Sequence, residues 1–177
     1  AAEPADAVRH LRAAGELAMR TGLPHLRLQV GLGRARVRRR AGDLDAALHQ
    51  LRGTVDVARR WMQATGQAVD SPAHELMTSI NDELIETLLA RGDHYSVVEA
   101  WQRTRAAKIA AIDSLNGGIR MLADESLPAV PQEPEIEFHV GVDDVVAFVL
   151  GDGQVDARRL PGAVATTRRL VTAWQQE

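Results

Sequence analysis

The stretch AGDLDAALHQLRGTVDVARRWM, residues 41–62, contains two features that decide the fold, a Gly-Asp corner and a long apolar stripe. The stripe consists of apolar residues three and four positions apart: Leu44, Ala47, Leu48, Leu51, Val55, Ala58 and Met62. This spacing predicts one face of a helix about five turns long. Burial of each larger side chain in the stripe is worth roughly 1.5–3 kcal/mol, so this face needs a partner helix.

Segments on both sides of this stretch have the same helical pattern. We expect further helices at about residues 4–20, 24–41, 72–91 and 94–115, with a loop at residues 66–72. The helix after the loop has Leu76, Met77, Ile80, Leu84 and Leu88 in register, and the next has Val97, Val98, Trp101, Ile109, Ile112 and Leu115. The aromatic content is only 3%, so the core must be built from aliphatic side chains, which favours packing of helix on helix.

The Gly-Asp corner occurs twice, at residues 41–47 and again at residues 91–97, each time between a first and a second helix. Glycine adopts the left-handed conformation that ends one helix, and aspartate caps the next. A small residue such as Ala47 lets the two helices approach closely. The pattern predicts antiparallel helix pairs that repeat along the chain.

These corners and helix pairs resemble the tetratricopeptide repeat in its longer-helix variants. The chain departs from that family because its signature aromatic residues are absent. Gly31 and Arg38 stand roughly where those aromatics are expected. An irregular helical bundle without repeat geometry is the alternative.

The proline content and the hydrophobic pattern of the sequence change after the last of these helices. Residues 117–134 contain three prolines, and this composition predicts a linker. Alternating apolar and polar residues then predict strands at residues 136–140, 145–150 and 155–160, joined as a meander, and residues 163–175 have a helical pattern. We therefore expect a mainly α chain, with antiparallel tetratricopeptide-like helix pairs followed by a small β-meander and a helix.

The segment EAWQRTRAAK (99–108), continuing to Leu115, resembles the junction of CHAT proteins when taken with the proline-rich linker and the meander up to residues 160–162. In that family, tetratricopeptide-like repeats lead through an Ala/Arg-rich helix into a caspase-like domain. The resemblance implies a repeat domain at residues 1–116, a linker at 117–134, and the truncated N-terminal part of a CHAT-like domain at 135–177. The catalytic His and Cys of the family would lie beyond Glu177, so no catalytic residue is expected in this chain.

Composition narrows the possible functions further. The net charge of −3 argues against nucleic-acid binding, and no apolar run approaches the length of a membrane span. The chain has no cysteine, which excludes disulfides, thiolate zinc sites and a cysteine nucleophile among these residues. We expect a cytoplasmic protein of bacterial type with no cofactor.

Three motifs that could signal chemistry fail on inspection. The run HELMT (74–78) begins like a zinc-protease helix, but Thr78 replaces the second histidine. Gly31 and Gly33 lie within a helical pattern rather than after a strand, so their role is close helix packing and not dinucleotide binding. No pair of the six histidines has ligand spacing, and no metal site is expected.

One cluster of charges suggests a binding site. Five arginines crowd the end of the second helix, where positive charge is also favourable for the helix dipole. In repeat geometry the first helix of each pair lines a groove. That places Gln29, Arg36, Arg39 and Arg40 on one wall and Asp82 and Glu86 on the other. Such a groove could hold a peptide with charges of both signs, and we expect charge reversal at Arg36 and Arg39 to weaken binding without unfolding the chain.

The leading hypothesis is a protein-interaction scaffold or sensor region of a CHAT-type protein, non-catalytic by itself. One alternative is part of a cysteine protease whose catalytic half lies outside this chain, and another is the helical sensor module of a regulator. Because the meander looks incomplete, we expect Phe138, Phe148 and Val149 to lack a covering layer. The remainder of a CHAT domain, or another chain, would then cover them.

Overall fold

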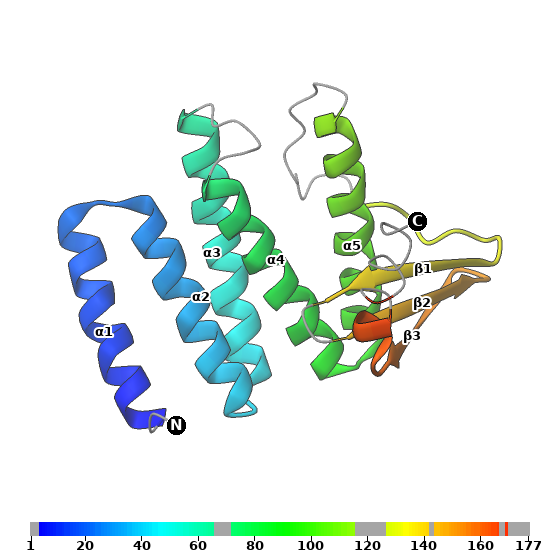
Figure 1. The fold of residues 1–177 in the computed structure, drawn as a ribbon, viewed down its shortest axis with the longest axis horizontal. Helices are drawn as coiled ribbons and strands as arrows, with labels where there is room; N and C mark the ends of the chain where they lie inside the picture. The colour runs from blue at the N-terminus through cyan, green and yellow to red at the C-terminus, as the bar shows by residue number, and fades with distance from the viewer. Residues whose placement is uncertain (1–3, 66–71, 116–126, 142–143, 167–168, 170–177) are drawn as a thin grey trace.

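The computed structural model describes residues 4–65, 72–115, 127–141, 144–166 and 169. Five helices come first within these residues and a three-stranded sheet follows (Figure 1). The helices are α1 (Pro4–Thr21), α2 (Pro24–Arg40), α3 (Leu44–Thr65), α4 (Pro72–Arg91) and α5 (His94–Leu115). The strands are β1 (Glu135–Val140), β2 (Val145–Gly151) and β3 (Gln154–Leu160), and helical residues follow at 163–166. The prediction of a mainly α chain that continues into a β-meander and a helix is confirmed.

Both Gly-Asp corners have the predicted backbone. Gly42 has a φ of 81° and Gly92 a φ of 72°, in the left-handed region that glycine adopts without strain. The Asp43 carboxylate accepts a hydrogen bond from the backbone N–H three residues later at 3.2 Å, and Asp93 does the same at 3.0 Å. Each aspartate thus caps the helix that begins after its corner, α3 or α5.

The helices lie side by side in a row and alternate in direction, and each packs against the next (Figure 1). Helix α2 also contacts α4, so these two helices share one side of the row. Glycines permit the close packing: a Cβ at Gly31 would collide with Thr54 of α3, and one at Gly33 would lie 2.7 Å from Leu11 of α1. The packing role predicted for these two glycines is confirmed.

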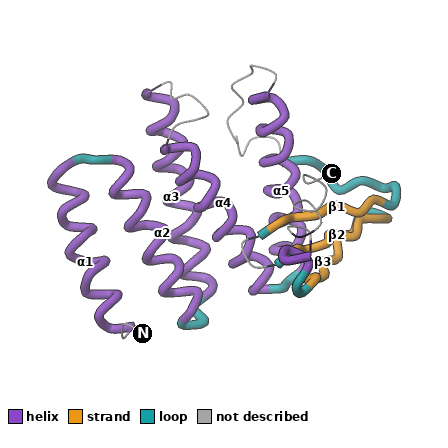
Figure 2. Tube along the Cα trace, in the orientation of Figure 1, coloured by secondary structure: helices purple, strands orange, loops and turns teal. Residues whose placement is uncertain are grey.

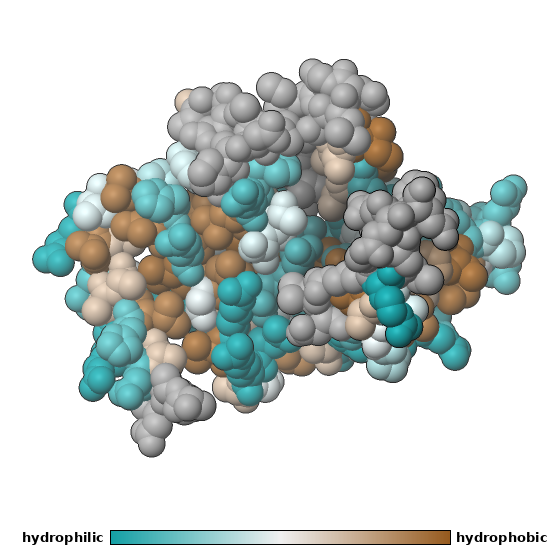
Figure 3. Space-filling view, in the orientation of Figure 1, coloured by the Kyte–Doolittle hydropathy of each residue, from teal (hydrophilic) through white to brown (hydrophobic). Residues whose placement is uncertain are grey.

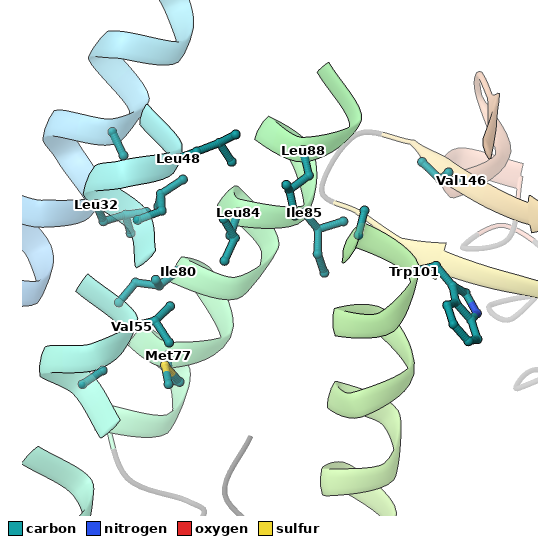
Figure 4. Packing of buried hydrophobic residues seen from close by; sticks show 14 of the residues in the cluster. Leu32, Leu48, Val55, Met77, Ile80, Leu84, Ile85, Leu88, Trp101 and Val146 are labelled. Atoms are coloured by element: carbon teal, nitrogen blue, oxygen red, sulfur yellow. The ribbon is translucent and has the colours of Figure 1, made fainter. Parts of the chain in front are cut away.

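One hydrophobic core joins the helices to the sheet. Its buried members come from α2 to α5, β2 and β3 (Figure 4). They are Leu28, Leu32, Ala35, Leu48, Leu51, Val55, Ala58, Met77, Ile80, Leu84, Ile85, Leu88, Ala100, Trp101, Val146, Phe148, Leu150 and Val155. Because Trp101 and Phe148 belong to the same cluster, the meander is packed on the helical stack rather than tethered to it.

The sheet has the strand order β1-β2-β3 with antiparallel pairing throughout (Figure 2). His139 of β1 is paired with Val146 of β2, and Phe148 of β2 with Ala157 of β3. Residues on one face of a strand alternate, so Val146, Phe148 and Leu150 of β2 share the face that is buried in the core.

Polar contacts fix β1 against α5. The Trp101 indole Nε1 donates a hydrogen bond to the Glu137 carboxylate at 2.6 Å, and Lys108 Nζ donates to the same carboxylate at 3.0 Å. Arg105 pairs with Glu135 at 3.1 Å, and its guanidinium lies 5.7 Å from the centre of the Trp101 ring. These contacts set the position of the sheet beside the helices.

One expectation about packing is wrong. Phe148 is fully buried because it faces the helices, whereas Phe138 and Val149 are 49% and 41% exposed, as expected. The apolar stripe of α5 is buried only at its start. Ile109 and Ile112 are 39% and 58% exposed, because the elements packed on α5 bury none of its described residues beyond Thr104.

Several sequence expectations fall outside the described residues. These are most of the loop at 66–72, the part of the linker at 117–126, and most of the helix expected at 163–175. The rest of the linker, residues 127–134, contains neither helix nor strand. Within the described ranges, no helix combines the length and apolar character needed to cross a membrane.

Candidate functional site

A charged groove of about 600 Å³ lies where α2, α4 and the sheet meet. Its lining comes from the last turns of α2, the middle of α4, the turn between β1 and β2, and β3. The residues are Arg36, Arg39, Arg40, Ser79, Asp82, Glu83, Glu86, Gly141, Asp144 and Arg159. On the face drawn in Figure 3, hydrophobic surface gathers over α1 and α2 and again beside the sheet.

The arginines predicted from the sequence form one wall of this groove, and they are organised by a residue that the sequence did not single out. Arg36 Nε and Arg39 Nε donate to the two carboxylate oxygens of Glu83, at 2.9 Å and 2.6 Å. The Glu83 side chain is only 6% exposed. A buried carboxylate needs charged or hydrogen-bonding partners, and here two guanidinium groups supply them.

The acidic wall is organised in the opposite way, with one arginine between two carboxylates. Arg159 of β3 donates through Nη2 to Glu86 of α4 at 2.8 Å, and through Nη1 to Asp144 at 2.7 Å. The hydrogen bond with Glu86, supported by the one with Asp144, raises the pKa of Arg159 above its ordinary value. This three-residue bridge joins the sheet to the helical stack within the lining of the groove.

Asp82 also lines this wall, and it interacts electrostatically with His139, a buried residue of β1 outside the lining. Burial raises the pKa of Asp82 above 3.8; nearby His139 opposes this shift and Glu86 adds to it. Burial also lowers the pKa of His139 below 6.5, against the pull of Asp82 and Glu86. His139 is 7% exposed, and its Nε2 atom has no hydrogen-bond partner among the described residues. Burial therefore favours the neutral form of the imidazole over the charged one.

Five of the six residues proposed from the sequence line the same groove: Arg36, Arg39, Arg40, Asp82 and Glu86. Gln29 is the exception; it is exposed on α2, two helical turns before Arg36, and does not contribute to the lining. Arg40 is exposed and makes no ion pair with any described residue. The geometry brings the charges together, and their role in binding remains a prediction.

Sequence reasoning missed three lining residues that carry much of the charge pattern. Glu83 was missed although it directly precedes Leu84 of the apolar stripe, a position that signals partial burial of a charge. Asp144 and Arg159 were missed because a hairpin gives no local signal of the helix on which it will dock. Only the tertiary packing of the sheet on α4 brings them to the groove.

The chemistry available in the groove is recognition by charge. Guanidinium groups bind oxyanions through planar, multiple hydrogen bonds. Within the part of the chain that the structure describes, no group of three or more His, Asp or Glu side chains is arranged to hold a metal ion.

The fold and the groove together define a class: a stack of antiparallel helices that carries a small sheet and a charged groove between them. No protein-family model, no curated protein and no solved structure matches the chain.

Proposed function

We propose that this chain is a protein-interaction scaffold that holds a segment of a partner protein in the groove between α2, α4 and the sheet. The observation that carries the proposal is the pair of hydrogen bonds from Arg36 and Arg39 to Glu83. A buried carboxylate that orients two arginines at the edge of a groove is costly for stability alone, since well-packed apolar residues would serve as well. The ion pairs instead hold the two arginines in a fixed orientation, as in a preorganised recognition surface.

The pairing of the helices supports the same proposal. In tetratricopeptide-like repeats the first helix of each pair lines the binding surface, and in this chain α2 and α4 are the helices that line the groove. Stacked helix pairs commonly present such extended surfaces to partner proteins. We include the cytoplasmic location, suggested by the overall composition, in this proposal.

We further propose that the scaffold is the sensor region of a CHAT-type protein. The support is the order of elements that suggested the resemblance: the long Ala/Arg-rich α5, a segment without regular structure at 127–134, and a three-stranded meander. In that setting a partner held in the groove would touch both the repeats and the sheet, because Asp144 and Arg159 belong to the sheet side of the lining.

Panning of a random-peptide phage library tests the scaffold proposal. The blocking variant is Ser79→Trp, which places an indole in the groove without changing any charge. Thr78→Trp is the matched control: its hydroxyl also bonds to the carbonyl four residues earlier at 3.1 Å, but Thr78 is exposed and outside the lining. We expect selected peptides to bind the wild type and Thr78→Trp and to lose binding to Ser79→Trp. Failure to enrich any peptide, or equal binding to both variants, would contradict the proposal.

A further inference from the structure

We infer that the segment held in the groove is acidic, and that Arg159 acts as an internal occupant of the acidic wall. The inference rests on the proposed function and adds the charge of the partner. It departs from the expectation, drawn from the sequence, of a peptide that carries both charges.

Arg159 already occupies two carboxylates of the acidic wall. Glu86 and Asp144 are each bonded to Arg159, at 2.8 Å and 2.7 Å, and their side chains are only 21% and 22% exposed. A basic side chain of a partner would have to displace an arginine that the chain itself supplies at no cost in association entropy. Glu86 and Asp144 therefore offer little to a cationic ligand, and burial disfavours the charged form of Asp82, the third carboxylate of this wall.

Among the described residues, the ion pairs of the basic wall leave several guanidinium donors unused. Arg36 and Arg39 each use Nε to bond Glu83, and the described structure shows no bond from their terminal Nη groups. Arg40 makes no ion pair with any described residue, so this wall carries three arginines and one buried carboxylate, Glu83. The wall thus carries an excess of positive charge and a set of donors that no described residue uses.

Glu83 fixes the orientation of those donors. Because Glu83 is nearly buried, it holds the two guanidinium groups in place without occupying the groove. Glu83 is in this sense a positioning residue. Preorganised arginines favour the planar carboxylates of aspartate and glutamate, which accept two parallel hydrogen bonds.

The same groove is poorly suited to a nucleic acid. Asp82, Glu86 and Asp144 line its other side, and a continuous phosphate backbone would bring charge against them at every nucleotide. An acidic peptide can place its carboxylates on the arginines and neutral residues opposite the acids. We therefore assign an acidic protein segment to the groove.

The experiment sequences the peptides selected in the panning and measures their affinity by fluorescence anisotropy. Arg40→Glu removes an exposed donor that no ion pair within the described structure needs, and Arg60→Glu on α3 makes the same change in net charge at an exposed position outside the groove. We expect the selected peptides to be enriched in Asp and Glu. Their affinity should fall about tenfold or more in Arg40→Glu and stay within about twofold of the wild type in Arg60→Glu.

A second selection against Arg159→Gln tests the role of the internal occupant. With Glu86 and Asp144 released, the enriched peptides should now contain Lys or Arg as well as acidic residues. A polyuridylate oligonucleotide serves as the probe for nucleic acid. Groove-bound peptides that are neutral or basic for the wild type, an unchanged selection against Arg159→Gln, or tighter binding of polyuridylate would each overturn the inference while leaving a binding groove. If no peptide is enriched at all, the proposed function fails with it.

Discussion

Arg39 and Glu83 are 44 positions apart in the sequence, yet Arg39 Nε lies 2.6 Å from a Glu83 carboxylate oxygen. The contact joins α2 to α4 directly across the side of the stack that α3 does not occupy. Glu83 also accepts a bond from Arg36 and is almost fully buried, so its charge is compensated by these two arginines. The ion pair therefore both stabilises the helical stack and shapes the groove.

Replacing this carboxylate should destabilise the chain. We expect Glu83→Gln to lower the free energy of unfolding by about 1–3 kcal/mol, because two partly buried arginines lose their shared counter-charge. The reduction stays below that of a fully buried pair because Arg36 and Arg39 are 49% and 33% exposed. Urea unfolding followed by circular dichroism measures the effect.

Glu75→Gln, on the same helix, is the matched control for that measurement. Glu75 is exposed, and its substitution should change the free energy of unfolding by no more than about 0.5 kcal/mol. Equal unfolding midpoints for the two variants would show that Glu83 contributes nothing beyond a surface charge.

The double charge reversal at Arg36 and Arg39 is a poor test of binding, because it would leave three carboxylates together.

The contact between Gly31 and Thr54 gives a second prediction, on the crossing of α2 and α3. A Cβ at Gly31 would overlap the Thr54 side chain, which its own hydrogen bond to the Gln50 carbonyl at 2.7 Å holds in place. We expect Gly31→Ala to lower the free energy of unfolding by about 1–3 kcal/mol. The loss should shrink when Thr54→Ala is introduced in the same chain.

Gly53 provides the opposite case on α3. An added Cβ there meets no atom within 4 Å, so Gly53→Ala should raise the free energy of unfolding by about 0.5–1 kcal/mol through helix propensity alone. Thermal unfolding of the two single variants therefore shifts in opposite directions. A stabilised Gly31→Ala would mean that the helices do not cross as closely as the structure shows.

The helices could be predicted from the sequence because their signals are local. A stripe such as Leu44 to Met62, with glycine and aspartate at its start, needs nothing from the rest of the chain to be recognised. The placement of Arg36 and Asp82 in one groove could also be predicted, because the predicted order of helix pairs sets which helices are neighbours. Periodicity and the order of the helices were therefore enough to predict five of the lining residues, on both walls of the groove.

The rest of the groove depends on contacts between distant segments. The burial of Phe148, and the arrival of Arg159 beside Glu86, both require the sheet to pack on α4 and α5. No spacing within β2 or β3 states which face of the sheet meets the helices. The same reason explains Gln29: its helix was predicted correctly, but the groove closes around the end of α2 and not its middle.

Asp82 should make stability depend on pH in an unusual direction. Burial raises the pKa of its carboxyl group above 3.8, so the folded state holds this proton more tightly than the unfolded state. Asp82 therefore favours folding in acid and loses that contribution as the pH rises through the raised pKa. We expect Asp82→Asn to stabilise the chain at about pH 7, and this gain to diminish as the pH falls towards 4. Urea unfolding at the two pH values checks it, and a gain that grows in acid would contradict it.

His139 should produce the opposite dependence. Burial lowers its pKa below 6.5, so the unfolded state takes up the proton first as the pH falls. The stability that neutral His139 allows is complete above about pH 6.5 and declines below it, down to the lowered pKa of the folded state. The charges that act on the imidazole are Asp82 and Glu86 on α4, Lys108 on α5, and Asp144 beside the sheet turn.

His139→Phe isolates this contribution, because it keeps an aromatic ring at the buried position and removes the titrating group. Between about pH 5 and pH 7, the free energy of unfolding should decline with acid less steeply in His139→Phe than in the wild type. Asp82→Asn should make the decline steeper, since it removes an anion that helps the folded state to bind the proton. Equal slopes in the wild type and His139→Phe would mean that the imidazole titrates as freely in the folded chain as in the unfolded one, which a side chain 7% exposed should not do.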